Sequence, residues 1–368
     1  MRYSGVLTLI LILNLYPARS QDKPDSTASK GILCLNLNNI NFLKNNEYSN
    51  PITEGYTLIG FFLQPELVYY PDKKVSLHLG THLLSYSGTN KFSFIKPVFS
   101  TNWHFSENTR FTIGSLAGSD EHRMFDPHYN KERIYNAYSE DGLQFRTESD
   151  HFFSDTWLSW ENYIFKGDGE REIFTAGESF RYATKAIAGI FRIEIPIQVQ
   201  FKHYGGQISN YSEQVETYLN VAAGVRTGLD IAQSLYGSAG FECLAFTGNS
   251  LNGNPSSGIK NGYAGWYKLF YSFKEAGFEA GFWSSHDFYA PNGNFIFSSV
   301  SDHLDNLVIS DRKLITFSAD LNLPYKDFLE FYFAFDGYYD TDLKRFDNAV
   351  TLHVRFDKLI KIVSIRNP

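Results

Sequence analysis

Residues 189–203 read GIFRIEIPIQVQFKH and alternate between apolar and polar side chains. Phe191, Ile193 and Ile195 fall on one side of the segment, whereas Arg192 and Glu194 fall on the other. Because successive side chains of a β-strand point to opposite faces, the stretch predicts a strand that is apolar on one face and charged on the other. The same alternation recurs from about residue 31 to residue 358.

The recurring alternation predicts sixteen strands joined by connections of two kinds. Connections from an even strand to the next odd strand are short, as at 71–74, whereas those from odd to even strands are mostly longer and rich in Gly, Asn and Asp, as at 119–141 and 289–310. An even number of strands leaves both chain ends on the side of the short turns. The predicted strands are 31–44, 56–70, 75–86, 91–104, 110–118, 142–148, 152–164, 172–182, 189–203, 216–229, 233–247, 261–273, 277–288, 311–322, 327–339 and 346–357.

This pattern resembles the porin-like β-barrels of Gram-negative outer membranes. The resemblance implies an all-β fold: a transmembrane antiparallel up-and-down β-barrel of about 16 strands, with short periplasmic turns and longer extracellular loops. It also implies an outer-membrane location with membrane lipid around the wall. A secreted soluble β-protein, with its apolar faces packed between two sheets, would show the same alternation and is the alternative. Pro65, Pro97 and Pro196 fall inside predicted strands, where we expect bulges.

The N-terminus has the pattern of a secretory signal peptide at residues 1–20. Arg2 precedes an apolar run, and Ala18 and Ser20 form a small-x-small pattern before Gln21. Residues 21–30 are polar and predicted to be flexible, 31–358 form the barrel, and 359–368 are either a short tail or an extension of the last strand. A leader of this kind predicts cleavage after export.

Composition and charge argue against a disulfide, a membrane-spanning helix and a nucleic-acid partner. Only two cysteines are present, and they fall on strands far apart in order, so a disulfide is not expected. Beyond the leader, no apolar run approaches the roughly 20 residues that a membrane-spanning helix needs. Removing Arg2 and Arg19 with the leader takes the formal charge from -7 to -9, which argues against a nucleic-acid partner.

The polar faces of the predicted strands are assigned to the barrel lumen, because a charge at the lipid midplane costs on the order of 2 to 4 kcal/mol. Acidic and basic side chains are mixed on these faces, and the slight acidic excess favours cations or neutral solutes. The candidate pore-lining residues are Glu66, His78, Lys96, Arg110, Arg146, Asp155, Glu161, Arg192, Glu194, Lys202, Glu216, Arg226, Glu242, Lys268, Asp320, Glu330, Asp336 and Arg355.

The connection at 119–141, SDEHRMFDPHYNKERIYNAYSED, is the candidate constriction. A long loop without strands of its own is often functional, so it is expected either to fold inward or to remain a solvated external loop. The residues proposed to narrow the pore are Asp120, Glu121, Arg123 and Asp126. Acidic and histidine side chains in this loop lack a defined ligand spacing, so no metal and no cofactor are expected.

The favoured function is a porin-like channel for passive diffusion of small polar solutes. A conduit for polysaccharide export and a plugged barrel that acts as an adhesin or structural protein are the alternatives; a homo-oligomer is also considered. No G-x-S-x-G motif occurs, and Ser285, His286 and Asp287 are consecutive, so they cannot share one face of a strand. The sequence therefore predicts a protein that is not an enzyme.

Overall fold

The computed structural model describes residues 30–187, 190–206, 210–211, 214–230 and 237–365. The predicted signal peptide and nearly all of the 21–30 segment lie outside these ranges. Sixteen strands dominate the described chain. Their bounds are β1 Ile32–Glu47, β2 Thr57–Asp72, β3 Val75–Tyr86, β4 Phe94–Ser106, β5 Thr109–Ser115, β6 Asp141–Glu148, β7 Phe152–Asn162, β8 Glu172–Ala183, β9 Phe191–Gly205, β10 Glu216–Asp230, β11 Ser238–Ser250, β12 Asn261–Phe273, β13 Ala276–His286, β14 Asp311–Tyr325, β15 Leu329–Asp340 and β16 Arg345–Ser364.

Each strand pairs antiparallel with its neighbours in the chain, and β1 pairs with β16 to close the barrel. The closing ladder runs from Ile32 opposite Ser364 to Glu47 opposite Asn348. Closure leaves no free edge, which removes the unpaired backbone groups that would otherwise promote aggregation. The fold class predicted from the alternation is thereby confirmed. β16 continues six residues beyond the predicted limit of 358, so residues 359–364 belong to a strand.

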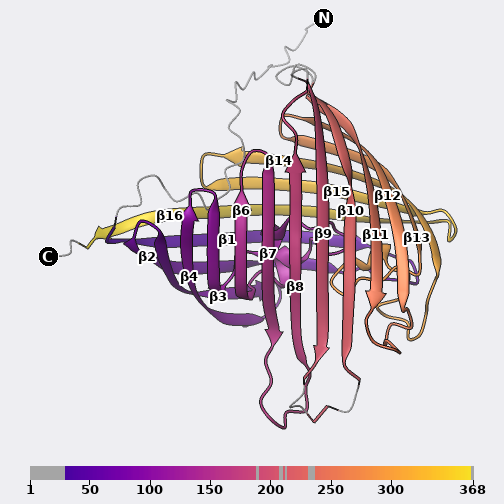
Figure 1. The fold of residues 1–368 in the computed structure, drawn as a ribbon, viewed down its shortest axis with the longest axis horizontal. Coiled ribbons are helices and arrows are strands. Elements are labelled where there is room, and N and C mark those ends of the chain that lie inside the picture. The colour runs from indigo at the N-terminus through magenta and orange to yellow at the C-terminus, as the bar shows by residue number, and fades with distance from the viewer. Residues whose placement is uncertain (1–29, 188–189, 207–209, 212–213, 231–236, 366–368) are drawn as a thin grey trace, which may run out of the picture.

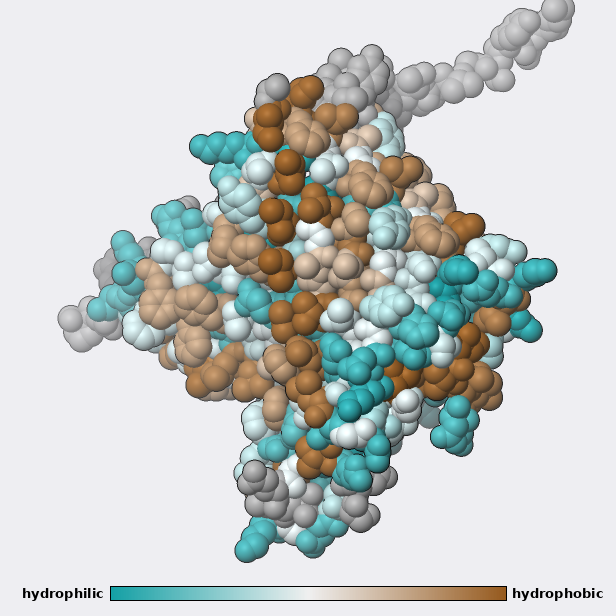
Figure 2. All heavy atoms as spheres, turned by 45° about the vertical axis from the view of Figure 1, so that its right-hand side comes forward, coloured by the Kyte–Doolittle hydropathy of each residue, from teal (hydrophilic) through white to brown (hydrophobic). Residues whose placement is uncertain are grey.

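The outward faces of the strands are apolar. Leu79, Phe99, Ile113 and Leu269 are each more than half exposed, and they point away from the barrel interior. Figure 2 shows such residues over much of the wall, with hydrophilic residues gathered toward the ends of the molecule. Apolar side chains wetted by acyl chains carry no hydration cost, so this surface fits a membrane-spanning barrel. Among the described residues, no helix has the length and apolarity to cross a membrane.

The barrel is flattened, so that its two walls cross rather than run parallel. In Figure 1 the strands β7 to β10 of the near wall run almost perpendicular to β1, β14, β15 and β16 behind them. Inward side chains of facing walls and of two long loops fill the space between the walls, and many of them are completely buried. Such a filled interior differs from the open aqueous channel that we expected for a sixteen-strand cylinder.

The prolines do not produce the bulges that we expected. Register shifts among the described strands lie elsewhere, beside Leu33, Tyr69, His104 and Trp160. At Pro65 and Pro196 the pairing on one side lapses for two residues and then resumes in the same register. Pro97 lies in a part of β4 that has no partner on the β5 side. The missing N–H groups are therefore accommodated by local gaps in the ladders rather than by extra residues.

Candidate functional site

Two long loops fold into the barrel interior. We call them together the plug; they comprise residues 116–140, which contain the short helices η1 Ser119–His122 and α1 Arg133–Asn136, and residues 287–310, which contain η3 Phe295–Phe297. His122, His128 and Ile296 are fully buried within them. The sequence left two positions open for the first loop, folded inward or solvated outside, and in the structure it is folded inward.

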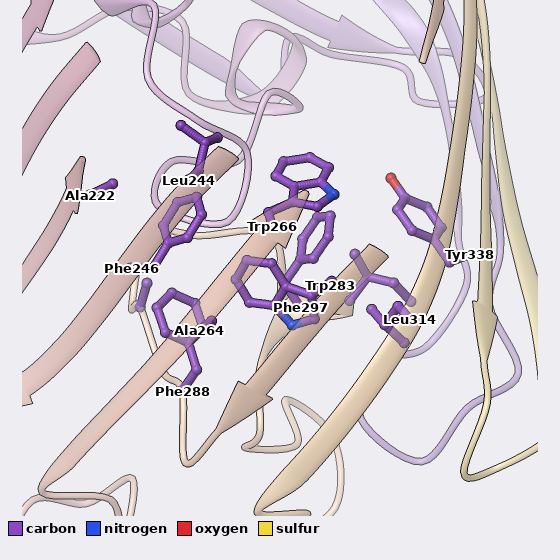
Figure 3. Packing of buried hydrophobic residues seen from close by; sticks show 12 residues of the cluster. Ala222, Leu244, Phe246, Ala264, Trp266, Trp283, Phe288, Phe297, Leu314 and Tyr338 are labelled. Carbon is purple, nitrogen blue, oxygen red and sulfur yellow. The ribbon is translucent and has the colours of Figure 1, made fainter. Parts of the chain in front are cut away.

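An apolar cluster holds the second loop of the plug against the barrel wall. Phe288, Ile296 and Phe297 pack on inward-facing side chains of β10 to β15, and Figure 3 shows Phe297 between Trp266 and Trp283. The ring centroids of Phe297 and Trp283 are 5.0 Å apart. Apolar inward faces in this half of the barrel therefore serve as a core for the loop rather than as the wall of an aqueous pore.

Hydrogen bonds join the two loops of the plug. The backbone N–H of Asn130 donates to the carbonyl of Asn292 at 2.8 Å, and Asn294 Nδ2 donates to Asp126 Oδ2 at 2.8 Å. Asp302 N–H donates to the carbonyl of Ile52 in the β1–β2 loop at 2.9 Å. Three connections on the long-loop side of the barrel thus form one connected structure.

A buried ion group anchors the first loop to the wall. His122 Nδ1 lies 2.8 Å from Asp155 Oδ2 on β7, and Nε2 lies 2.8 Å from Glu140 Oε2. The ring also stacks on Trp157, with centroids 3.9 Å apart. Burial alone would lower the pKa of His122, but the two carboxylates outweigh it and raise the pKa to about 9. His122 is therefore a cation at neutral pH and links the loop to β7.

The candidate pore-lining residues lie on the strands, and many of them form ion pairs on the inward face. Lys268 Nζ lies 2.5 Å from Glu242 Oε2, and Lys202 Nζ lies 2.5 Å from Glu161 Oε2. Arg226 and Glu279 remain about one-third exposed and are 3.7 Å apart. Their role in lining a pore stays a prediction.

The four constriction candidates contact the wall and the other plug loop. Asp120 pairs with Arg355 at 3.0 Å, Glu121 with Arg146 at 2.8 Å and Arg123 with Glu148 at 2.8 Å. These contacts neutralise the charges of Asp120, Glu121 and Arg123, which we had expected to narrow the pore. In the described chain, no group of three or more His, Cys, Asp or Glu side chains is placed to hold a metal ion.

The barrel wall has a notch above β5 and β6. The β4–β5 ladder stops at Ser100 opposite Gly114, and the β6–β7 ladder stops at Gly142 opposite Ser159. Both β4 and β7 continue beyond those pairs, so their ends flank a gap of three strand spacings, about 14 Å. The end of the first plug loop, residues 133–140, lies behind this gap.

A cavity of about 220 Å³ occupies the notch. Its wall comes from three sources: the ends of β3 and β4, the plug, and the end of β7. The residues that line it are His82, Phe94, Lys96, Arg133, Asn136, Ala137, Tyr138, Ser139, Glu140, Ser159, Trp160 and Glu161. Charged groups therefore face the cavity from several sides, and two large aromatic side chains, both partly exposed, stand at its edge.

The charges in the notch cavity are held in place by partners. Lys96 Nζ lies 2.7 Å from Asp141 Oδ2 and donates to the carbonyl of Ser139 at 3.1 Å. Arg133 lies 3.2 Å from Glu140 Oε1. Burial would raise the pKa of Glu140, but His122 and Arg133 lower it to about 2, so this carboxyl is ionised at neutral pH.

The hydrogen bonds around His82 define which of its nitrogens is basic. Gln64 Nε2 donates to Glu66 Oε1 at 2.7 Å, which turns Gln64 Oε1 toward His82 Nδ1, 2.9 Å away. An amide oxygen only accepts, so Nδ1 carries the hydrogen and Nε2 is the unprotonated nitrogen of the neutral ring. A neutral histidine with one unprotonated nitrogen can act as a general base.

His82 and Trp160 were not among the predicted site residues. His82 lies on β3 and lines the cavity, but nothing in the sequence brings it beside residues 133–140 or 159–161. One signal was present: the adjacent segments 110–118 and 142–148 are shorter than most of the other predicted strands. Where two neighbouring strands are both short, the barrel wall is lower than on either side, and the notch lies at that position.

The architecture is a closed, sixteen-stranded antiparallel β-barrel, a fold that outer-membrane porins share. The solved structures it resembles include OpdL from Pseudomonas aeruginosa, with a TM-score of 0.52, 10% sequence identity and coverage of 89% of this chain and 99% of that chain. The outer membrane protein OprD from Pseudomonas aeruginosa gives a TM-score of 0.50, 10% identity and coverage of 90% and 96%. At this identity the likeness concerns the fold.

A family model described as lipid A 3'-O-deacylase-type matches residues 23–365, and the chain belongs to that family. No curated protein matches the sequence. The family name denotes an enzymatic activity, which overturns our prediction that the protein is not an enzyme. That prediction relied on motifs of contiguous residues, whereas the inward-facing groups described above converge from separate strands and loops.

Proposed function

We propose that this protein is an outer-membrane hydrolase that removes an acyl chain from an ester-linked glycolipid of the lipid A type, with the notch cavity as its active site. The family supplies the reaction class, and the cavity supplies a place for it. The observation that carries the proposal is the combination of a charged cavity with an opening in the side of a lipid-facing wall.

The surroundings of the notch suit an amphiphile. Ile95 and Phe99 on β4, Ile113 on β5 and Leu143 on β6 are exposed on the outer face around it. Acyl chains can therefore stay in contact with apolar surface while a polar headgroup reaches through the gap. Lys96 and Arg133 supply positive charge for phosphate, and Trp160 supplies an aromatic face for a sugar ring.

His82 is the candidate catalytic residue. In this mechanism Nε2 takes a proton from a water molecule as the water oxygen bonds to the ester carbonyl carbon. The carbon–oxygen bond to the sugar then breaks, and the proton on Nε2 passes to the departing sugar oxygen. Gln64 and Glu66 act as positioning residues, because they keep the hydrogen on Nδ1. Lys96 or Arg133 can stabilise the negative charge that develops on the carbonyl oxygen.

The test is release of fatty acid from purified lipid A mixed with the folded protein in detergent, measured by mass spectrometry. A general base contributes about 10²–10⁴-fold, so His82→Gln should lower the rate by at least 100-fold. His286→Gln is the matched control, since His286 is exposed and lies at the end of β13. Wild-type protein that folds and releases no fatty acid would refute the proposed reaction. An unchanged rate in His82→Gln would remove His82 from it.

Passive diffusion of small polar solutes is a second candidate. It is favoured by the partly exposed charges, such as Arg226 and Glu279, in the inward faces near the short-turn end. The plug opposes it, because buried side chains fill the long-loop half. Single-channel recording in planar bilayers decides the matter: a steady open conductance supports diffusion, and a closed barrel contradicts it.

A further inference from the structure

A serine, a histidine and a glutamate form a hydrogen-bonded series on the inward face of β2 and β3; none of the three lines the notch cavity, although the other oxygen of Glu66 accepts from Gln64, which orients His82. Ser76 Oγ lies 3.0 Å from His78 Nε2, and His78 Nδ1 lies 3.0 Å from Glu66 Oε2. The two nitrogens of one imidazole ring thus face a hydroxyl on one side and a carboxylate on the other. This order of contacts is the one that activates a serine nucleophile.

The arrangement follows from the register of the β2–β3 hairpin. Ser76 and His78 are two residues apart on β3, so their side chains share the inward face about 6–7 Å apart along the strand. Val68 of β2 pairs with His78, and Glu66 pairs with Gly80, which places the glutamate diagonally across from the histidine. Because Gly80 has no side chain, the carboxylate of Glu66 has room to lie over that position.

The order of contacts distinguishes this series from another set of the same residue types. Ser301 Oγ and Asp302 Oδ1 both approach Nδ1 of His303, at 3.4 Å and 3.1 Å. A single nitrogen cannot both take a proton from serine and donate to the carboxylate, so that set provides no relay. In the β2–β3 series the carboxylate holds the hydrogen on His78 Nδ1 and leaves Nε2 free to accept from Ser76.

We propose that Ser76, His78 and Glu66 form an additional hydrolytic site that accepts small, water-soluble carboxylic esters. Ser76 Oγ bonds to the ester carbonyl carbon as its proton passes to His78 Nε2, and the alcohol leaves with that proton. A water molecule then gives a proton to His78 Nε2 and bonds to the acyl carbon. The carboxylic acid departs as Ser76 Oγ regains the proton.

The position of the series implies that substrates reach it from the short-turn side of the barrel. Ser76 is the second residue of β3, directly after the turn that joins β2 to β3. Ser76 is almost fully buried as a residue, whereas the His78 side chain is one-fifth exposed. Substrates that enter here must be small, and they come from the end of the barrel opposite the plug.

A donor for the developing oxyanion lies across the strand pair. Asn102 on β4 is the register partner of Ser76, so the two side chains start about 4.5–5.5 Å apart. Thr112 Oγ1 donates to Asn102 Oδ1 at 2.6 Å, which leaves the NH₂ half of the amide as the donor. An amide donor of this kind is worth about 10²–10³-fold in rate when it is aimed at the oxyanion.

The test uses a fluorophosphonate probe on the folded, detergent-solubilised protein. Attack by Ser76 would form an oxygen–phosphorus bond and release fluoride, while the hydroxyl proton passes to His78. Peptide mass spectrometry should then find the phosphonyl group on Ser76. His78→Ala should slow the labelling at least tenfold, and Ser179→Ala, which removes another buried inward-facing serine, should leave it unchanged.

The decisive result comes from the wild-type protein itself. A folded barrel that stays unlabelled at Ser76 overturns the proposal, and so does labelling that His78→Ala leaves at the wild-type rate. Should His78→Ala fail to fold, Ser76→Cys replaces it: iodoacetamide should alkylate that thiol well below pH 8, and a pH dependence typical of a free thiol overturns the proposal. The probe requires no glycolipid, so this outcome is separate from fatty-acid release at the notch.

Discussion

His122 lies wholly inside the protein, and the pKa of its ring, raised to about 9 by Glu140 and Asp155, ties the stability of the plug to pH. The folded pKa lies above the ordinary value of about 6.5, so the stabilisation is complete below pH 6.5 and is lost as the pH rises through 9. Replacing His122 with Gln leaves the buried Asp155 carboxylate without the imidazolium and leaves Glu140 with Arg133 alone, and breaking a buried pair in this way costs about 3–5 kcal/mol. Thermal unfolding followed by circular dichroism should show the variant melting earlier.

The pH dependence separates loss of charge from loss of shape at this residue. The difference in unfolding temperature between wild type and His122→Gln should be largest below pH 6.5 and should shrink toward pH 10. His286→Gln is the control, because its exposed pair with Asp311 is 2.8 Å long but fully open to solvent screening. A difference that stays constant from pH 6 to pH 10 would mean that packing against Trp157, and not charge, is what the variant loses.

Among the structural elements, the second plug loop depends on apolar contacts rather than on charge. Phe297 is almost fully buried against Trp266, Trp283 and Tyr338. Phe297→Ala should destabilise the loop by about 3–5 kcal/mol, because it removes a buried ring and leaves a cavity. Limited proteolysis should then cut within residues 298–310 at protease concentrations that leave the wild-type protein intact.

Leu304→Ala provides the comparison within the same loop, since Leu304 is 44% exposed and its truncation leaves no cavity. Its proteolysis should match that of wild type. Equal resistance of Phe297→Ala and wild type would show that hydrogen bonds such as that from Asn130 to Asn292, rather than the apolar cluster, keep the loop inside the barrel.

The sequence predicts which face of each strand points inward, but it does not predict where the long loops lie. Alternation has a period of two in every strand, so it identifies inward faces such as those of Glu66, His78 and Lys96 from local residues alone. The inward face carries partly exposed charges in one half of the barrel and an apolar cluster in the other, and this difference follows the position of the loops. Nothing in the order of residues states that 116–140 and 287–310 share one interior, since their contacts join residues more than 150 positions apart.

At the scale of the whole molecule, strand number and closure were predictable because each hairpin is a local structure with its own alternation. The flattening of the barrel was not predictable from the sequence, because it depends on how opposite walls and the plug pack together. The absence of a contiguous catalytic motif was also uninformative: Ser76 and His78 are close in sequence, but Glu66 joins them only through the β2–β3 register. Catalytic geometry in a barrel is distributed over neighbouring strands, so a motif search along one segment misses it.

The pairing of β1 with β16, which closes the barrel, can be tested by a disulfide cross-link between the two strands. Leu43 and Leu352 are register partners on the outer face. Residues directly opposite in an antiparallel pair have Cα atoms about 4.5–5.5 Å apart, within the range of a disulfide. In a background without Cys34 and Cys243, the pair Leu43→Cys and Leu352→Cys should cross-link on mild oxidation, and the heat-denatured protein should migrate faster without reductant. Leu43→Cys with Val350→Cys shifts the partner by two residues and should cross-link far less. Equal yields from both pairs would contradict the register, and no cross-link in either would contradict closure, since only a closed wall brings the two ends of the chain into adjacent strands.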